Sequence, residues 1–93
     1  MVIGVCEIRL SMPGNRSLKD KRTVLKSIKD RIHNRFNVSI AEVGEHEAWR
    51  SARLTAAVVA GSGAHAHRVL ESVVRQIEGR RDAVLLGYSI EML

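Results

Sequence analysis

Cysteine, aromatic residues and long apolar runs are all scarce in this chain of 93 residues. The single cysteine, Cys6, excludes an internal disulfide and fits a reducing compartment. No apolar run approaches the roughly 20 residues that a membrane-spanning helix needs. The first ten residues also lack the charged leader and cleavage site of a secretory signal. We therefore expect a cytoplasmic protein that does not insert into a membrane.

Motifs for catalysis, metals and cofactors are equally sparse. Cys6 falls on the apolar side of an alternating segment, where a buried thiol is inert. His65 and His67 stand two apart, so on a helix they point about 200° from each other and cannot share one ion. Gly61-Ser62-Gly63 lacks the lysine of a phosphate-binding loop, and Ser62 is explained by a helix N-cap. We expect no catalytic residues, no metal and no cofactor, and we favour a protein that is not an enzyme.

What the sequence does have is positive charge, concentrated in one segment. Between Arg16 and Arg35 there are eight basic and two acidic residues, a net charge of +6 within a total of +5. The rest of the chain therefore carries about −1. Such asymmetry predicts one basic surface, which favours nucleic acid or another polyanion as partner.

Hydrophobic periodicity divides the chain into six elements. Residues 2–11 alternate as a half-buried strand, and residues 37–43, 53–60 and 83–93 predict three more strands. A helix is expected from Ser17, whose spacing to Asp20 resembles a capping box, to about Asn34. A second helix ends near Gly79. The first helix has an apolar stripe of four residues: Leu18, Leu25, Ile28 and Ile32.

The resulting order, βαββαβ, predicts an α+β, ferredoxin-like plait in a single domain covering residues 1–93. Its four-stranded antiparallel sheet would have both helices on one face and the first and third strands in the middle. The other face would be left open. Those central strands contain no aromatic residue, which argues against stacking of RNA bases on the open face. The third strand is small and apolar on both alternations, so the open face could instead pair with its own copy as a homodimer, or bind a protein partner.

Basic residues recur at helical spacing along the first helix. Lys19, Arg22, Lys26, Lys29 and His33 follow one another at intervals of 3, 4, 3 and 4, in a strip about 20 Å long. The alternative is an ordinary solvated face, because lysine and arginine are good helix formers. The excess of basic over acidic residues in this segment favours a phosphate-binding strip over an ordinary solvated face. We take as phosphate-binding candidates four residues of this strip together with Arg16, which lies just before the helix: Arg16, Lys19, Arg22, Lys26 and Lys29.

The positive end of the helix dipole would add to this strip. Lys19, Lys21 and Arg22 fall in the first turns, where free amides and the dipole already favour an anion. An enzyme or binder that holds a phosphorylated small molecule at this helix end is a third alternative. Trp49, next to Arg50, is a candidate for stacking on a base, although a tryptophan between two strands more often caps the end of the core.

The segment SLKDKRTVLKSIKDRIHNRFNVSIAEV, followed by the Trp49 region and RLTAAVV, resembles the YlxP-like family of small bacterial proteins, a domain-of-unknown-function family. The resemblance covers nearly the whole chain. It implies a cytoplasmic bacterial protein with a ferredoxin-like fold and no assigned catalytic residues. Many members are encoded near the genes for initiation factor two and the ribosome-binding factor. This implies a role in translation or ribosome assembly, with ribosomal RNA or a ribosome-associated partner as the target.

Overall fold

The computed structural model describes residues 1–93, and it confirms the predicted order of elements. The elements are β1 (Val2–Ser11), α1 (Leu18–Arg35), β2 (Ser39–Gly44), β3 (Ser51–Ala60), α2 (Gly63–Glu78) and β4 (Val84–Met92). The predicted boundaries differ from these by one or two residues, except that α2 extends back to the glycine after its N-cap.

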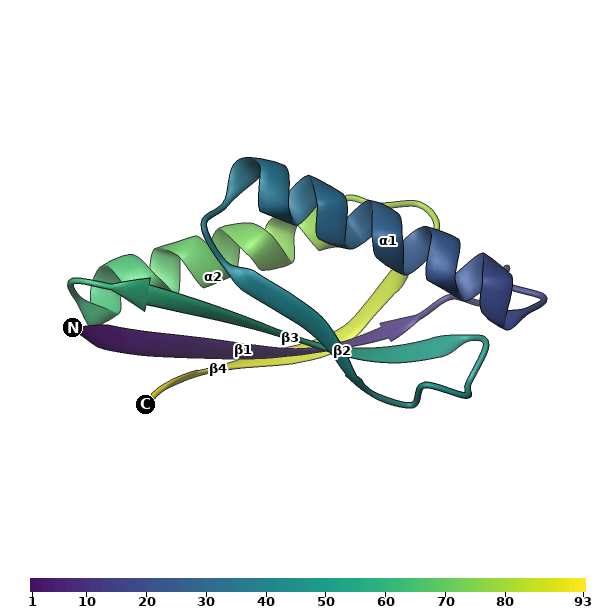
Figure 1. The fold of residues 1–93 in the computed structure, drawn as a ribbon, viewed down its shortest axis with the longest axis horizontal. Helices are drawn as coiled ribbons and strands as arrows, with labels where there is room; N and C mark the ends of the chain where they lie inside the picture. Colours follow the sequence, from purple (N-terminus) through teal and green to yellow (C-terminus); the bar gives the residue numbers. More distant parts are fainter.

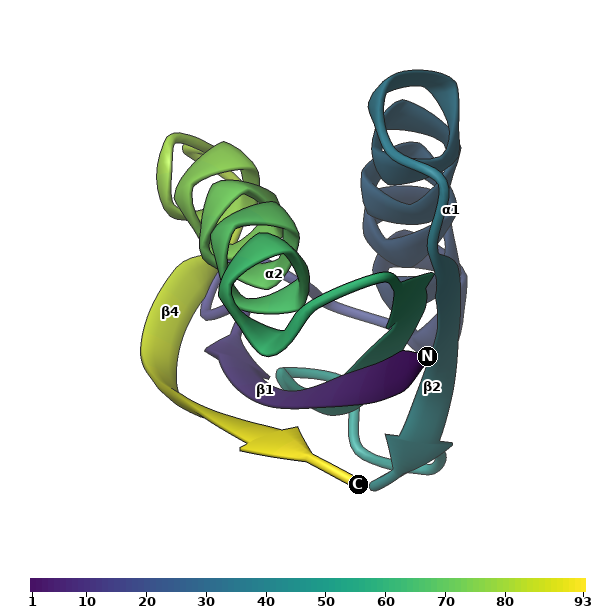
Figure 2. The ribbon, with the colours of Figure 1, turned by 90° about the vertical axis from the view of Figure 1, so that its left-hand side faces the viewer.

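The four strands form one antiparallel sheet in the order β2-β3-β1-β4. β1 and β3 are therefore central, as predicted, and they pair without a break from Val2–Ala60 to Ser11–Ser51. Both helices cover the same face of the sheet, α1 above the edge strand β2 and α2 above β1 and β4 (Figures 1 and 2). This confirms the ferredoxin-like plait.

The core lies between the sheet and the two helices. Cys6, Ile8 and Leu10 alternate into it from β1, and β3 contributes Leu54, Ala56 and Val58 in the same way. From the helices come residues spaced three or four apart, which keeps them on one face of each helix: Leu25, Ile28, Ile32, Leu70, Val73, Val74 and Ile77. Leu18, the first member of the predicted stripe, is only half-buried.

Cys6 is fully buried, as its position on the apolar side of β1 predicted. Burial raises the pKa of its thiol to about 11, with smaller contributions from the negative charges of Glu71 and Glu7. At neutral pH the side chain is therefore a neutral thiol that packs as a small apolar group.

Both helices begin at a serine cap. The Ser17 Oγ accepts a hydrogen bond of 3.1 Å from the backbone N–H of Asp20, and the Ser62 Oγ accepts one of 3.2 Å from His65. Asp20 in turn accepts the backbone N–H of Arg16 at 2.8 Å. In the usual capping box the third helical residue accepts the N–H of the cap, whereas here Asp20 accepts the N–H of Arg16, the residue before the cap. Neither helix is both long and apolar enough to cross a bilayer.

Candidate nucleic-acid interface

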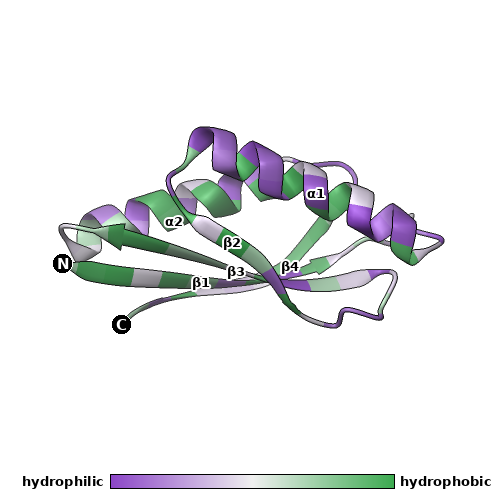
Figure 3. Ribbon diagram, in the orientation of Figure 1, coloured by the Kyte–Doolittle hydropathy of each residue, from purple (hydrophilic) through white to green (hydrophobic).

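The predicted phosphate-binding residues lie along one flank of α1. Lys19, Arg22 and Lys26 are exposed, Lys29 is half-buried at the margin of the core, and Arg16 is exposed just before the helix. The opposite flank carries Ser27, whose hydroxyl contacts Arg80 in the segment after α2. The basic flank therefore faces away from α2, on a helix that carries hydrophilic residues along much of its length (Figure 3). We call Arg16, Lys19, Arg22, Lys26 and Lys29 the basic flank.

One member of the basic flank is already neutralised. The Lys26 Nζ lies 2.7 Å from Asp30 Oδ2, one helical turn further on. This hydrogen bond raises the pKa of Lys26 and lowers that of Asp30, so both groups are charged at neutral pH. No carboxylate lies within ion-pair distance of the other four side chains. The unpaired charges of the flank therefore lie mainly in its N-terminal half, on Arg16, Lys19 and Arg22. Lys29 is a further unpaired charge, separated from them by the paired Lys26.

The N-terminus of α1 is less receptive to anions than its charge pattern predicted. The Asp20 carboxylate accepts the N–H of Arg16, and Ser17 accepts the N–H of Asp20. A negative charge thus already sits where the helix dipole is positive. Phosphates would have to bind along the flank rather than at the end of the helix.

Lys21 does not add to the exposed positive charge of the first turns, so the prediction that placed it there with Lys19 and Arg22 is wrong for this residue. Its side chain is 2% exposed. The Nζ donates hydrogen bonds to the backbone carbonyls of Glu45, at 2.7 Å, and Ala48, at 2.8 Å. It also lies 2.9 Å from Glu42 Oε2, a close ion pair in which that oxygen accepts no aligned hydrogen bond. Lys21 thus ties α1 to β2 and to the β2–β3 loop.

The β2–β3 loop depends on this contact for its shape. Glu45 has a φ of 58°, the left-handed conformation that costs a residue with a side chain about 1 kcal/mol or more. In this conformation its carbonyl oxygen meets the Lys21 ammonium, and it also accepts the N–H of Ala48 at 3.0 Å. Two charge-assisted hydrogen bonds from a buried lysine offset that local strain.

Trp49 follows directly after this anchored turn, and its ring is exposed. The side chain is 51% exposed, so the expectation that it caps the end of the core is wrong. Its backbone, however, is fixed: the Trp49 carbonyl accepts a hydrogen bond of 3.0 Å from the buried side chain of Asn15. The Arg50 Nε donates to the Asn15 carbonyl at 2.9 Å. An exposed aromatic ring is therefore held on a rigid backbone, beside the residue that precedes Arg16.

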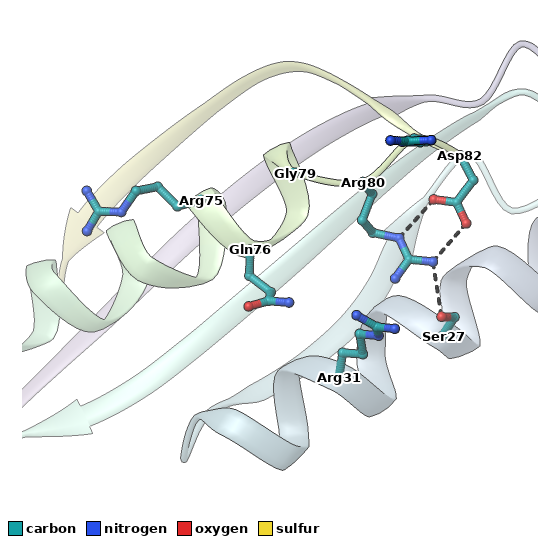
Figure 4. Close-up of a pocket in the computed structure, with 8 residues that line it drawn as sticks. Ser27, Arg31, Arg75, Gln76, Gly79, Arg80 and Asp82 are labelled. Atoms are coloured by element: carbon teal, nitrogen blue, oxygen red, sulfur yellow. Dashed lines mark hydrogen bonds and ion pairs between the residues drawn. The ribbon is translucent and has the colours of Figure 1, made fainter.

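A second group of cations, which the sequence did not predict, gathers between the two helices. A cavity of about 550 Å³ lies between α1 and the end of α2 and has no hydrophobic residue in its lining (Figure 4). We call it the arginine cleft, after the four arginines that line it together with one carboxylate: Arg31, Arg75, Arg80, Arg81 and Asp82. A hydrogen bond from Arg80 lowers the pKa of Asp82, with smaller contributions from the charges of Arg80 and Arg31.

The open face of the sheet is divided into an apolar and a charged half. Val59 is 67% exposed and stands opposite Ile3 at one end of the central strands. Toward the other end, Arg9 and Arg53 face each other directly across β1 and β3, and neither has an ion-pair partner. Such a pair of like charges opposes close packing of a second sheet on that half.

Comparisons with known proteins agree with the fold and with the sequence pattern. Residues 3–90 match the family model described as "Protein of unknown function (DUF503)". The chain is also 36% identical over 77 residues to "Uncharacterized protein YlxP" of Bacillus subtilis (strain 168), covering 83% of this chain and 84% of the relative. With nearly the whole chain matched by both, this ferredoxin-like protein belongs to the YlxP-like DUF503 family.

Proposed function

We propose that this protein binds RNA through the basic flank of α1, mainly by contacts to phosphates. The observation that carries the proposal is the row of cations on one side of the helix, of which four have no carboxylate partner. Because successive phosphates of a nucleic acid strand repeat every few ångströms, a rod-like array of this kind can neutralise several at once.

Trp49 favours a single-stranded segment as the ligand. Its ring is exposed at the end of α1 that carries Arg16 and Lys19, and Lys21 and Asn15 hold the backbone on both sides of it. A base of the strand that follows the basic flank can stack on such a ring, which supplies affinity with little sequence preference. The expected specificity is therefore low.

Ribosomal RNA is the target that we favour among RNAs. This choice rests on the resemblance to the YlxP-like family, whose genes often lie near those of translation factors. The geometry of the chain supports contact with a phosphate backbone and does not select one RNA.

The dependence of affinity on salt tests the proposal. One phosphate on each of the four unpaired cations, with a smaller share from Lys26, gives a slope of log affinity against log salt of about −3 on a single-stranded RNA. Lys19→Ala should flatten the slope by about 0.7. Lys26→Ala should flatten it by less than half of that, because Lys26 must first give up Asp30. Fluorescence anisotropy with a labelled oligonucleotide measures these values.

The matched control is Arg68→Ala, which removes an exposed arginine from α2 and leaves the basic flank intact. Its slope should equal that of the wild type. A wild-type slope near zero, or equal losses in Lys19→Ala and Arg68→Ala, would contradict binding by the basic flank.

Self-association through the open sheet face is a second candidate function, favoured by the exposure of Val59 beside Ile3 and Val5. In that case the partner is a second copy of the chain, packed on the apolar half of the sheet. The basic flank lies on the opposite side, so both functions are compatible.

Light scattering tests this second candidate with Val59→Asp. We expect the wild type to scatter as a dimer, at about twice the 10.3 kDa of the chain, and Val59→Asp as a monomer with unchanged RNA affinity. A charge buried in an apolar interface costs several kcal/mol, enough to dissociate a moderate dimer. Ala64→Asp, an equal change of charge at the exposed start of α2, should leave the dimer intact. A wild type that scatters as a monomer at all concentrations would rule out the dimer.

A further inference from the structure

The arginine cleft lies apart from the basic flank and is built differently. Arg31 and Lys19 are twelve residues apart, which places them about 120° apart around α1 at 3.6 residues per turn. Arg31 shares its flank with Ser27, which faces Arg80, whereas Lys19 points away from α2. The cleft thus gathers charges from α1, α2 and the segment that leads into β4.

Arg80 is the fixed part of the cleft. Its Nε and Nη2 donate to the two carboxylate oxygens of Asp82, at 2.9 and 2.8 Å, and Nη2 also donates to the Ser27 hydroxyl at 3.0 Å. The side chain is only 15% exposed. Its third nitrogen, Nη1, makes no hydrogen bond within the protein. A guanidinium is therefore held in one orientation with a donor unused.

Two further side chains extend toward Arg80 from the two helices, as Figure 4 shows. Arg31 comes from α1 and has no carboxylate partner. Gln76 comes from α2, and its Oε1 accepts a hydrogen bond of 2.8 Å from Arg35. Because that oxygen is occupied, the amide NH₂ of Gln76 is the group left to serve a ligand.

The chemistry of the lining selects an oxyanion. The unused groups are donors, and Asp82, the single carboxylate of the lining, is committed to Arg80. Guanidinium forks match the oxygens of a phosphate and bind it through paired hydrogen bonds. Since no apolar or aromatic residue lines the cavity, it contains no apolar pocket for a base or another ring.

We propose that the arginine cleft is a binding site for the phosphate groups of a phosphorylated ligand, recognised between Arg31 and Arg80. Because the Arg75 side chain extends away from Arg80 (Figure 4), three arginines against one carboxylate leave a net charge of +2, so a pyrophosphate group should bind better than a single phosphate. The cleft should contact only the phosphate groups of the ligand, so a nucleoside attached to them should change the affinity little. The site does not depend on RNA binding by the basic flank.

Calorimetric titration with inorganic pyrophosphate, at constant ionic strength, tests the site. We expect saturable binding of one pyrophosphate, tighter than that of orthophosphate by about tenfold. Arg31→Gln should weaken it at least tenfold, as loss of a charge-assisted bidentate contact predicts. Arg68→Gln removes one positive charge from α2 outside both the cleft and the basic flank, and it should leave the affinity within about twofold. Arg31 is exposed and without an ion pair, so its replacement leaves the fold intact.

Three results would overturn the proposal. They are binding that does not saturate, equal losses in Arg31→Gln and Arg68→Gln, and equal affinities for pyrophosphate and sulfate. A separate experiment adds pyrophosphate to the complex with labelled RNA. It distinguishes phosphates of the RNA chain from those of a free molecule as the natural ligand. Release of RNA from the wild type but not from Arg31→Gln assigns the cleft to phosphates of the RNA chain, and unchanged RNA binding assigns it to a free phosphorylated molecule. A failure of RNA binding alone would leave the pyrophosphate result standing.

Discussion

Lys21→Ala lowers the free energy of unfolding by about 3 kcal/mol, the order expected when one partner of a buried ion pair is removed. The truncation leaves the carbonyls of Glu45 and Ala48 without their donor and Glu42 without its counter-charge. In a chain of this size about 3 kcal/mol is a large part of the total stability, and it should lower Tm by roughly 15 °C. Urea or thermal denaturation followed by circular dichroism measures the loss.

Lys19→Ala is the matched control for this result. It removes the same side chain two residues earlier on α1, where the lysine is exposed, so the stability should change by less than about 0.5 kcal/mol. The double change Lys21→Met with Glu42→Met separates the two contributions. It removes the buried charges together but still leaves two carbonyls unpaired, and it should recover only part of the loss. A loss below about 1 kcal/mol in Lys21→Ala would show that the contact does not hold the loop.

The positions of the secondary-structure elements could be predicted from sequence, because each element has its own period. In β1 the alternation of Cys6, Ile8 and Leu10 places one face of the strand in the core. Ser17 and Ser62 mark the helix starts through cap chemistry that involves only neighbouring residues. With the order of elements in hand, few arrangements satisfy right-handed connections, and the plait is the simplest of them.

The role of Lys21 was missed because a lysine on a charged helix is usually solvated. A signal was nevertheless present: with Lys21 included, the stripe of Leu18, Leu25, Ile28 and Ile32 acquires an unbroken 3, 4, 3, 4 spacing. Position 21 is therefore on the core face, and a lysine there needs buried acceptors. Those acceptors are two loop carbonyls and Glu42, all more than twenty residues away in the chain.

The arginine cleft could not be predicted from a charge count along the chain. Outside the basic segment the net charge is about −1, yet Arg80 and Arg81 line one cavity with Arg31 once the helices pack together. Their convergence is a property of the tertiary fold, since α2 and its following segment end beside the middle of α1 (Figure 4). Patterns read along the sequence reveal a charge cluster only when its residues lie on the same helix or strand.

Stability and binding meet at the β2–β3 loop. Lys21 and Asn15 hold the backbone on either side of Trp49, so the ring is presented without being buried. A stacking residue on a fixed backbone loses little conformational entropy when a base binds. The same hydrogen bonds that stabilise the fold therefore prepare the aromatic surface, and Lys21→Ala should weaken RNA binding even in its folded fraction.

Simultaneous replacement of Arg16, Lys19 and Arg22 by glutamine should have the largest effect on RNA binding. Loss of three phosphate contacts flattens the salt slope by about 2.1, from about −3 to about −0.9, and lowers the affinity at 0.1 M salt by roughly 100-fold. All three side chains are exposed and unpaired, so the fold and its stability should be retained. Anisotropy titrations at several salt concentrations, with circular dichroism as the check on folding, give both quantities.

Trp49→Ala distinguishes stacking from charge in the same assay. It should lower the affinity by about tenfold, within the 1–3 kcal/mol of a base–aromatic contact, at every salt concentration and with an unchanged slope. Asp30→Asn should act in the opposite direction, because it frees Lys26 for a phosphate and steepens the slope. If the triple variant keeps the wild-type slope, the phosphates are bound elsewhere. If Trp49→Ala flattens the slope, the ring organises the charged flank rather than stacking on a base. Only a changed slope in the first variant together with an unchanged slope in the second fits a strand that runs along α1 and ends on Trp49.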